Sequence, residues 1–278
     1  MNHSGGSFGA ALPLQSGCAN AEGMEARPLE GRHALITGGG TGIGAAAAIE
    51  LGNAGAKLSL LGRRTAPIQH TAVRTGGTAF QCDVADPGQI RKAFDEAREA
   101  NGPIEMLVVN AGIADSAPFH KTSRDSWDRI IAVNLTAAFD CAQAAIGDLL
   151  ASENGRLIFV ASVASLRGVP YAAHYAASKH GLLGLARSLA AEYAKTNLTV
   201  NAVCPGYVDT PMTDQSIARV SAVTGRSEDQ SRSAVEGMNA SGRLVDPNGI
   251  ATLILTLCLP QSRDINGAAL TIDGGTSA

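Results

Sequence analysis

The sequence has few cysteines, and none belongs to a metal-site or paired redox motif. The five cysteines are odd in number and widely spaced, and no C-x-x-C pair or H-E-x-x-H motif occurs. Zinc sites and disulfide frameworks need closer or paired ligands. We therefore expect the protein to bind no metal and to be cytoplasmic. Its cysteines are expected to be free thiols: Cys18, Cys82, Cys141, Cys204 and Cys258.

An excess of charge of one sign and a long apolar run are also missing. Twenty-two Lys and Arg residues face 25 Asp and Glu residues, which gives a formal net charge of -3, and no basic run stands out. This composition excludes the electrostatic signature of nucleic-acid and anionic-membrane binding. The most apolar stretch, Ile250 to Leu259, is far shorter than the roughly 20 residues that cross a bilayer. A small-molecule partner, no nucleic acid and no membrane are expected.

The first 26 residues contain no Lys or Arg, so they lack the positive start of a secretory signal. We expect residues 1–28 to be a disordered N-terminal extension, with Met24 as an alternative start. Residues 29–278 are expected to form one domain.

Short runs rich in Val, Ile and Leu alternate with longer Ala-rich segments of helical period from Arg32 onward. This alternation predicts a doubly wound α/β fold with a parallel sheet and helices on both faces. Seven strands are expected, at residues 33–37, 57–61, 78–82, 104–109, 155–161, 198–203 and 268–272.

Capping residues predict where some helices begin and end. Asp86, followed by Pro87, is expected to cap a helix with Gln89 as the partner in a capping box, and Gly55 is expected to close the helix that begins after Gly42. Residues 211–242 fit no strand and are rich in Ser, Arg and Met, which is typical of a substrate lid in a compact domain.

A glycine-rich turn joins the first expected strand to the first expected helix. The spacing is Gly38-x-x-x-Gly42-x-Gly44. Glycines let a backbone approach a pyrophosphate, and a helix N-terminus offers free N–H groups to it. A plain tight turn is the alternative, but the position between strand and helix favours phosphate binding.

Tyr175 and Lys179 lie four residues apart in a segment of helical period, so both project from one helix face. A tyrosine with a pKa of about 10 is a poor acid or base at neutral pH, and a nearby cation such as Lys179 is expected to lower that pKa. Ser162 ends an apolar strand, where its hydroxyl can bond a substrate oxygen. Alone, a Y-x-x-x-K spacing is common and indicates nothing.

Five motifs in one order change that reading. The glycine turn, Asn110-Ala111-Gly112, Ser162, Tyr175-Ala-Ala-Ser-Lys179 and Asp273-Gly274-Gly275 together resemble the short-chain dehydrogenase/reductase family. The resemblance covers residues 29–275 and implies a single-domain Rossmann-type fold.

The resemblance also implies the roles of four catalytic residues. Tyr175 would be the general acid in reduction and the base in oxidation. Lys179 would lower its pKa and bond the nicotinamide ribose. Ser162 would orient the carbonyl, and Asn134 would hold a water that relays protons to Lys179.

The nicotinamide cofactor is expected to lie along the glycine turn. The family pattern places Asp83 at the adenine edge, Asn110 along the adenosine as a brace of the central strand, and Thr210 on the carboxamide. The full set of expected cofactor contacts is Gly38, Gly40, Thr41, Gly42, Ile43, Arg63, Arg64, Asp83, Val84, Asn110, Ala111, Gly112, Tyr175, Lys179, Pro205, Gly206, Val208 and Thr210.

The end of the second strand favours NADP(H) over NAD(H). An acidic residue at this point bonds the ribose 2′-hydroxyl in NAD-binding folds, but Gly62 stands there and Arg63 and Arg64 follow. A guanidinium matches a 2′-phosphate in charge and geometry. Two solvated surface arginines are the alternative.

The substrate is expected to be a carbonyl compound or alcohol. The pocket should be formed by residues 114–118, 164–171, Tyr207 and the lid from Pro211, which are mostly apolar or small. Reduction of a ketone such as a 3-oxoacyl thioester is the first hypothesis. A free 3-oxo acid is disfavoured because Ala164 stands where related 3-hydroxybutyrate dehydrogenases carry a histidine.

Two other functions stay open. One is an NAD-dependent secondary alcohol or 3-hydroxyacid dehydrogenase that works oxidatively, and the other is a cofactor-sensing binding protein without catalysis. Apolar helices at about 123–152 and 171–195 further suggest a homotetramer.

Overall fold

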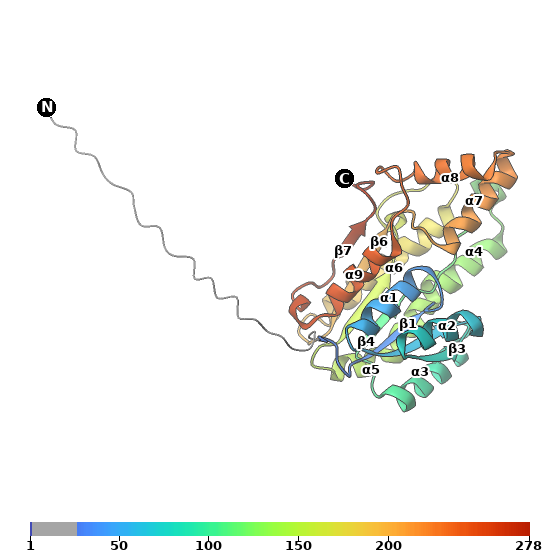
Figure 1. Cartoon of the computed structure of the whole chain (residues 1–278). Helices are drawn as coiled ribbons and strands as arrows, with labels where there is room; N and C mark the ends of the chain where they lie inside the picture. Colours follow the sequence, from blue (N-terminus) through green and yellow to red (C-terminus); the bar gives the residue numbers. More distant parts are fainter. Residues whose placement is uncertain (2–26) are drawn as a thin grey trace.

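The computed structural model describes Met1 and residues 27–278. These residues form a seven-stranded parallel sheet with the order β3-β2-β1-β4-β5-β6-β7 (Figure 1). The strand order reverses between β1 and β4, the point at which doubly wound sheets bind ligands. The predicted Rossmann-type α/β fold and its seven strands are confirmed.

The elements follow the predicted alternation. The strands are β1 His33–Thr37, β2 Lys57–Gly62, β3 Thr78–Gln81, β4 Met106–Val109, β5 Arg156–Val160, β6 Thr199–Pro205 and β7 Ala269–Ile272. The α-helices are α1 Gly42–Asn53, α2 Thr65–Thr75, α3 Pro87–Asn101, α4 Arg124–Ile131, α5 Ala137–Ala151, α6 Ala173–Glu192, α7 Pro211–Thr224, α8 Glu228–Glu236 and α9 Pro247–Cys258. Short turns of helix are η1 Phe119–Lys121, η2 Ala132–Thr136, η3 Val163–Ser165 and η4 Pro260–Ser262.

Each face of the sheet is covered by its own set of helices. Alternate side chains of a strand point to opposite faces, so Leu35 of β1 packs with α3, α5 and α6, while Ala34 and Ile36 pack with α1, α2 and α9. Because both faces are buried, the strands are continuous apolar runs rather than alternating ones. The apolar segment ending at Leu259 is α9, a buried helix as expected.

The helix ends match the predictions with one correction. The side chain of Asp86 caps α3 by accepting from the N–H groups of Gly88 and Gln89, and Gly55 lies just after α1 with a φ of 99°. The expected capping box at Gln89 was wrong. The Oε1 of Gln89 accepts from the N–H of Asp83 at 2.9 Å, and not from the N–H of the N-cap residue Asp86 as a capping box requires. Gln89 thus ties α3 to the end of β3.

The segment 211–242, called the lid below, contains two helices beyond the carboxyl ends of the strands, α7 and α8 (Figure 1). A capping box between Ser227 and Gln230 starts α8. Asn239 fixes the base of the lid: its Oδ1 accepts from Tyr207 N at 2.9 Å, and its Nδ2 donates to Tyr207 O and Arg243 O at 2.8 Å each.

The helical run Arg124–Ala151 is long and apolar enough to cross a membrane by length and composition alone. Its buried side chains, among them Cys141 and Leu149, pack against the sheet in the same core as α3 and α6, which is the behaviour of a core helix. The run is interrupted by η2, a π-helical turn.

The expected N-terminal extension, residues 1–28, lies almost wholly outside the described residues, as does Met24. Among the described residues, Leu29 is the first that is buried, and its N–H donates to Ala54 O at 2.9 Å.

A buried histidine lies at the start of β1. The ring of His33 is hydrogen-bonded through Nδ1 to Gly102 O at 2.7 Å and through Nε2 to Ser59 Oγ at 2.8 Å. Burial lowers the pKa of His33 below its ordinary value of 6.5, although the carbonyl of Gly102 opposes the shift. The folded chain therefore prefers the neutral imidazole.

We predict that this histidine makes the fold less stable in acid. Below the unfolded pKa the unfolded chain binds more protons than the folded one, so the free energy of unfolding falls as pH falls. Urea denaturation of the wild type at pH 7.5 and 5.5 should show this loss, and His33→Gln should show a smaller one. His70→Gln, at an exposed site on α2, is the control and should behave as wild type; an equal loss in wild type and His33→Gln would contradict the assignment.

Candidate active site

The glycine turn has the open geometry that a phosphate needs. Gly38 and Gly42 have φ values of 67° and 53°, which L side chains rarely adopt. A Cβ at Gly40 would lie 2.9 Å from the backbone of Pro67 and Ile68, so any side chain there would collide with α2. The turn ends at the N-terminus of α1, whose free N–H groups and positive dipole end suit an anion.

Asn110 holds this turn against the end of β4. Its Nδ2 donates to Thr37 O at 2.9 Å and to Gly38 O at 3.3 Å, and the N–H groups of Asn110 and Ala111 both donate to Thr37 Oγ1 at 3.0 Å. A Cβ at Gly44 would lie 2.5 Å from that Nδ2. The expected brace is therefore observed, and contact of Asn110 with adenosine stays a prediction.

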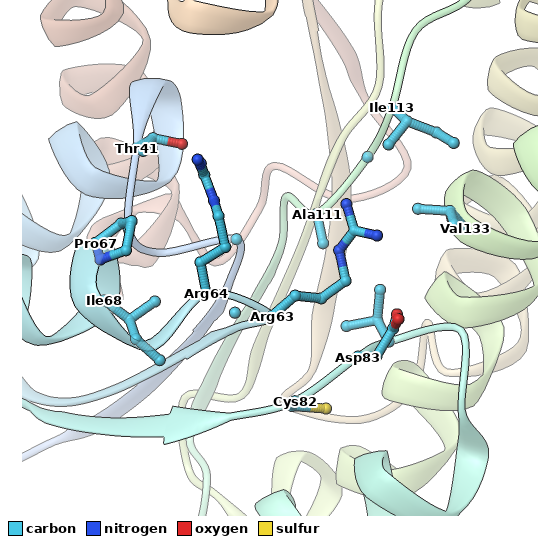
Figure 2. Close-up of a pocket in the computed structure, with 15 residues that line it drawn as sticks. Thr41, Arg63, Arg64, Pro67, Ile68, Cys82, Asp83, Ala111, Ile113 and Val133 are labelled. Atoms are coloured by element: carbon cyan, nitrogen blue, oxygen red, sulfur yellow. The ribbon is translucent and has the colours of Figure 1, made fainter.

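A cleft opens over the carboxyl ends of β1 to β4 (Figure 2). Nine of the expected cofactor residues line it: Gly38, Gly40, Thr41, Arg63, Arg64, Asp83, Val84, Ala111 and Gly112. Six further lining residues are Gly62, Pro67, Ile68, Cys82, Ile113 and Val133. The cleft combines small glycine and alanine residues with two cations and one carboxylate, a lining that suits a nucleotide cofactor.

The two arginines of the cleft point in different directions. Figure 2 shows Arg63 extending toward Ala111 and Val133, and Arg64 extending toward Thr41. Neither guanidinium forms an ion pair with any residue that the structure describes. Both positive charges are therefore available to an anion in the cleft.

The segment after β6 meets the glycine turn from the other side. A Cβ at Gly42 would lie 2.9 Å from Thr210 Cγ2, so Thr210 contacts the turn. Val208 is bridged to Val245. Ile43, the second residue of α1, packs against the core and does not line the cleft. Pro205 ends β6, and Gly206 follows it at the start of this segment.

Ser162 and Tyr175 meet beside the cleft. Ser162 follows β5 and starts η3, with its Oγ accepting from Ala164 N at 3.1 Å. Burial raises the pKa of Tyr175, a hydrogen bond with Ser162 lowers it, and the nearby Tyr207 raises it further. The net shift keeps the phenol protonated at neutral pH.

Lys179 lies one turn of α6 after Tyr175, as its spacing predicted. Its Nζ is 5.9 Å from the centre of the Tyr175 ring and donates to Val160 O at 2.9 Å. The expected lowering of the Tyr175 pKa by Lys179 is not observed. Burial dominates instead: it raises the pKa of Tyr175 and lowers that of Lys179 to about 8, which weakens the cation that would act on the phenol.

Asn134 lies in the π-helical turn η2, which places it over the loop after β4. Its Oδ1 accepts from Ile113 N at 2.8 Å, and its Nδ2 donates to Ile113 O at 2.9 Å and to Ser178 Oγ at 3.2 Å. Ser178 in turn donates to Tyr175 O at 2.7 Å. The amide of Asn134 thus joins the loop after β4 to α6.

Gly112 leaves the space in which these groups meet. A Cβ there would lie 3.3 Å from Asn134 Oδ1 and 3.8 Å from Lys179 Nζ. The structure therefore brings Asn134 and Lys179 together, while the relaying water expected between them stays a prediction.

The expected walls of the substrate pocket also converge. The N–H of Ala117 donates to Tyr171 O at 2.7 Å, and Arg219 of α7 donates to Ser116 O at 3.4 Å. Tyr171 has a φ of 62°, alone among non-glycine residues of the described part. Loops after β4 and β5 and the lid therefore border one entrance.

The sequence interpretation missed several contacts. Ser178 lies inside the Tyr-Ala-Ala-Ser-Lys motif, and Ile113 directly follows Asn110-Ala111-Gly112, so both adjoin residues that were singled out. Ile68 and Val133 carried no signal, because they reach the cleft only through the packing of α2 and η2.

Comparison with known proteins agrees with this site. A family model described as short chain dehydrogenase matches residues 32–220. The chain belongs to this family. It is an enzyme that interconverts CH–OH and C=O groups with a nicotinamide cofactor.

Three relatives illustrate the range of the short-chain dehydrogenases that resemble it. The 3-oxoacyl-[acyl-carrier-protein] reductase MabA of Mycobacterium bovis is 35% identical, over 89% of this chain and 94% of its own. The 2-(S)-hydroxypropyl-CoM dehydrogenase 3 of Xanthobacter autotrophicus is 34% identical, over 87% and 95%. A crystal structure of an actinorhodin polyketide ketoreductase variant with NADPH superposes with a TM-score of 0.85 at 30% identity, covering 91% of this chain and 99% of that chain.

The placement of Tyr175 beside Ser162 predicts that its hydroxyl is essential. Tyr175→Phe keeps the ring in its buried position and removes only the proton donor, so kcat should fall at least about 100-fold, a typical effect for general acid catalysis. Cofactor affinity, measured by fluorescence titration, should stay within about twofold. Tyr193→Phe, at the far end of α6, is the control and should leave kcat unchanged. A Tyr175→Phe enzyme with more than a tenth of wild-type kcat would refute the role.

Proposed function

We propose that this chain is an NADP(H)-dependent reductase that converts a ketone, such as a 3-oxoacyl thioester, to a secondary alcohol with Tyr175 as proton donor. The observation that carries the proposal is the meeting of Ser162, Tyr175 and Lys179 next to a cleft that contains Arg63 and Arg64. The cleft supplies the place for the cofactor, and the half-buried Tyr175 with the buried Ser162 and Lys179 supplies the proton chemistry.

Each buried group has a defined task in the reduction. When bound in the cleft, the nicotinamide would supply a hydride to the carbonyl carbon. Ser162 would donate a hydrogen bond to the carbonyl oxygen and fix its position. Tyr175, kept protonated by burial, would transfer its proton to that oxygen as negative charge develops there. Lys179 would stabilise the phenolate that remains.

The charge distribution of the cleft supports NADP(H). Gly62 leaves no carboxylate at the position that would repel a 2′-phosphate, and the side chains of Arg63 and Arg64 project into the space beside it (Figure 2). A guanidinium forms charge-assisted hydrogen bonds with phosphate oxygens. The similar ketoreductase solved with NADPH agrees with this choice.

The nature of the entrance supports an uncharged ketone. Ala164 is small and buried, so it offers no group for a substrate carboxylate next to Ser162. Reductases of 3-oxoacyl groups are among the relatives of similar length. An acyl thioester presents its ketone without a free carboxylate, which fits this pocket.

An oxidative dehydrogenase is the second candidate, because one relative of similar identity is named as a dehydrogenase of a secondary alcohol. Activity with NAD⁺ and a secondary alcohol or 3-hydroxy acid that exceeds ketone reduction with NADPH would favour it. A cofactor-sensing protein without catalysis would have no use for a buried Lys179 beside Tyr175, so any robust turnover excludes it.

We predict that Arg63→Ala raises the KM for NADPH by roughly 10- to 100-fold, because one or two charge-assisted hydrogen bonds of about 1.5 to 3 kcal/mol are lost. The KM for NADH should hardly move, and the double variant with Arg64→Ala should lose more. Arg74→Ala, which removes the same charge at the end of α2, is the control. Steady-state kinetics with both cofactors decide the matter: a wild-type kcat/KM that is equal or better with NADH would overturn the NADP(H) proposal.

The reverse exchange at Gly62 needs a second change. A Cβ at Gly62 would lie 2.8 Å from Ile68 Cγ2, so Gly62→Asp alone would disturb the start of α2. Gly62→Asp combined with Ile68→Ala makes room for the carboxylate and should move the preference toward NADH by repelling the 2′-phosphate. Ile68→Ala alone is its reference.

We also propose that the chain assembles as a homotetramer in the cytoplasm. Trp127 and Phe139, on the helical run 124–151, are 38% and 45% exposed. Gly184, on the exposed side of α6, leaves space for a close neighbour. Exposed apolar helices of this kind mark interfaces between copies of a chain. Free thiols at the four described cysteines support a reducing compartment.

Light scattering at micromolar concentration should give a mass near four times the 28.3 kDa of one chain. Phe139→Glu places a charge on the exposed apolar face of α5 and should lower that mass, since a buried unpaired charge disfavours association. The control is Asp140→Glu, which keeps the charge pattern. A wild-type mass of one chain would refute the assembly.

A further inference from the structure

Asp115, in the loop after β4, is the side chain on which three helices converge. Its Oδ2 accepts from Ser126 Oγ at 2.7 Å and pairs with Arg129 Nη2 at 3.4 Å, both on α4. The same oxygen lies 4.0 Å from Nε2 of the buried His174 on α6. Its Oδ1 pairs with the Nη1 of Arg219 on α7.

This cluster contains one anion and two cations. The Asp115 side chain is only 15% exposed, whereas those of Arg129 and Arg219 are 62% and 46% exposed. Burial and the charge of Arg129 lower the pKa of His174, so the imidazole is neutral and adds no further cation. The carboxylate is therefore the only group here that offsets the two guanidinium charges.

The cluster joins the loop after β4 to the lid, two of the segments that we expect to form the substrate pocket. Asp115 belongs to the loop that forms one wall, and the N–H of Ser116 donates to its Oδ1 at 2.9 Å. Arg219 belongs to the lid and also donates to Ser116 O. If Arg219 were not paired with Asp115, the N–H donors of its guanidinium would be free to bind a substrate carboxylate, whose geometry they match.

We propose that Asp115 determines the charge preference of the substrate site: by pairing with Arg219 and Arg129 it disfavours carboxylate substrates and favours uncharged carbonyl compounds. The inference rests on the proposed ketone reduction and names its substrate class. Arg219 cannot bind a substrate carboxylate bidentately while it is paired, and the charge of Asp115 repels the anion. Ala164 adds no cation next to Ser162 that would reverse this preference.

Two substrates with the same reacting ketone test the proposal: ethyl acetoacetate, which is uncharged, and acetoacetate, which carries a carboxylate. The readout is the ratio of kcat/KM for the acid to that for the ester, measured with NADPH. Asp115→Asn keeps the shape and an acceptor for Ser126 but frees both arginines, so the ratio should rise about 3- to 10-fold, the size of partly screened charge effects. A purely structural role would lower both rates and leave the ratio unchanged.

Removing Arg219, the partner of Asp115 on α7, should change the acid-to-ester ratio in the opposite direction. Arg219→Ala alone leaves Asp115 less neutralised and should lower the ratio. In the Asp115→Asn background, Arg219→Ala should cancel the gain. Asp125→Asn removes one negative charge from an exposed site at the start of α4 and should leave the ratio within about twofold of wild type. Arg167, which is exposed in the loop before α6, is unchanged throughout and does not affect the comparison.

A ratio that stays within twofold in Asp115→Asn, or that rises equally in Asp125→Asn, would overturn the proposal. If Asp115→Asn does not fold, Arg219→Ala decides by the sign of its change. If wild type reduces neither ketone, the proposed function fails, and the charge preference is then measured as dissociation constants of 3-hydroxybutyrate and its ethyl ester with NADP⁺ present. If the ratio of these two dissociation constants is the same in wild type and in Asp115→Asn, the proposed charge preference is overturned.

Discussion

The parallel direction of all seven strands is the constraint on which the site depends. Because every strand runs the same way, every loop that follows a strand emerges at one edge of the sheet. The glycine turn follows β1, the arginines follow β2, Asp83 follows β3, Asn110 follows β4 and Ser162 follows β5. Residues that are far apart in the sequence therefore meet without any long loop, and the helices on both faces bury the apolar strands that hold them there.

Burial decides the protonation states of the reacting groups more strongly than their neighbours along the helix do. Lys179 follows Tyr175 by one turn, yet its ammonium is buried and directed to the carbonyl of Val160. Removal of water raises the pKa of the tyrosine and lowers that of the lysine, so both shifts favour the neutral forms. A neutral, protonated tyrosine suits donation of a proton to a carbonyl. The same folded site thus holds Tyr175 as the phenol and not as a preformed phenolate.

The sequence predicted the strands, the glycine turn and the catalytic spacing because each depends on local patterns. Periodicity along a few residues determines β1 or α6, and the four-residue separation of Tyr175 and Lys179 needs only the helix. The redirected Gln89, the bond from Lys179 to Val160 and the contact of Ile68 with the cleft depend on how separate elements pack. No local pattern contains that information, so these features became visible only in three dimensions.

Contacts of different physical character hold the lid at Asn239 and at Arg219. At its base, Asn239 makes three hydrogen bonds to the backbone of Tyr207 and Arg243, and these are neutral, buried and insensitive to salt. Farther along, Arg219 holds α7 to Asp115 by an ion pair that is partly exposed and therefore screened by salt.

Thr210, which contacts the glycine turn, is the N-cap of α7, the helix that also carries Arg219. Displacement of α7 would consequently move Thr210 at the glycine turn together with Arg219 at the loop after β4. One helix thus couples the glycine turn, through Thr210, to the loop after β4, through Arg219.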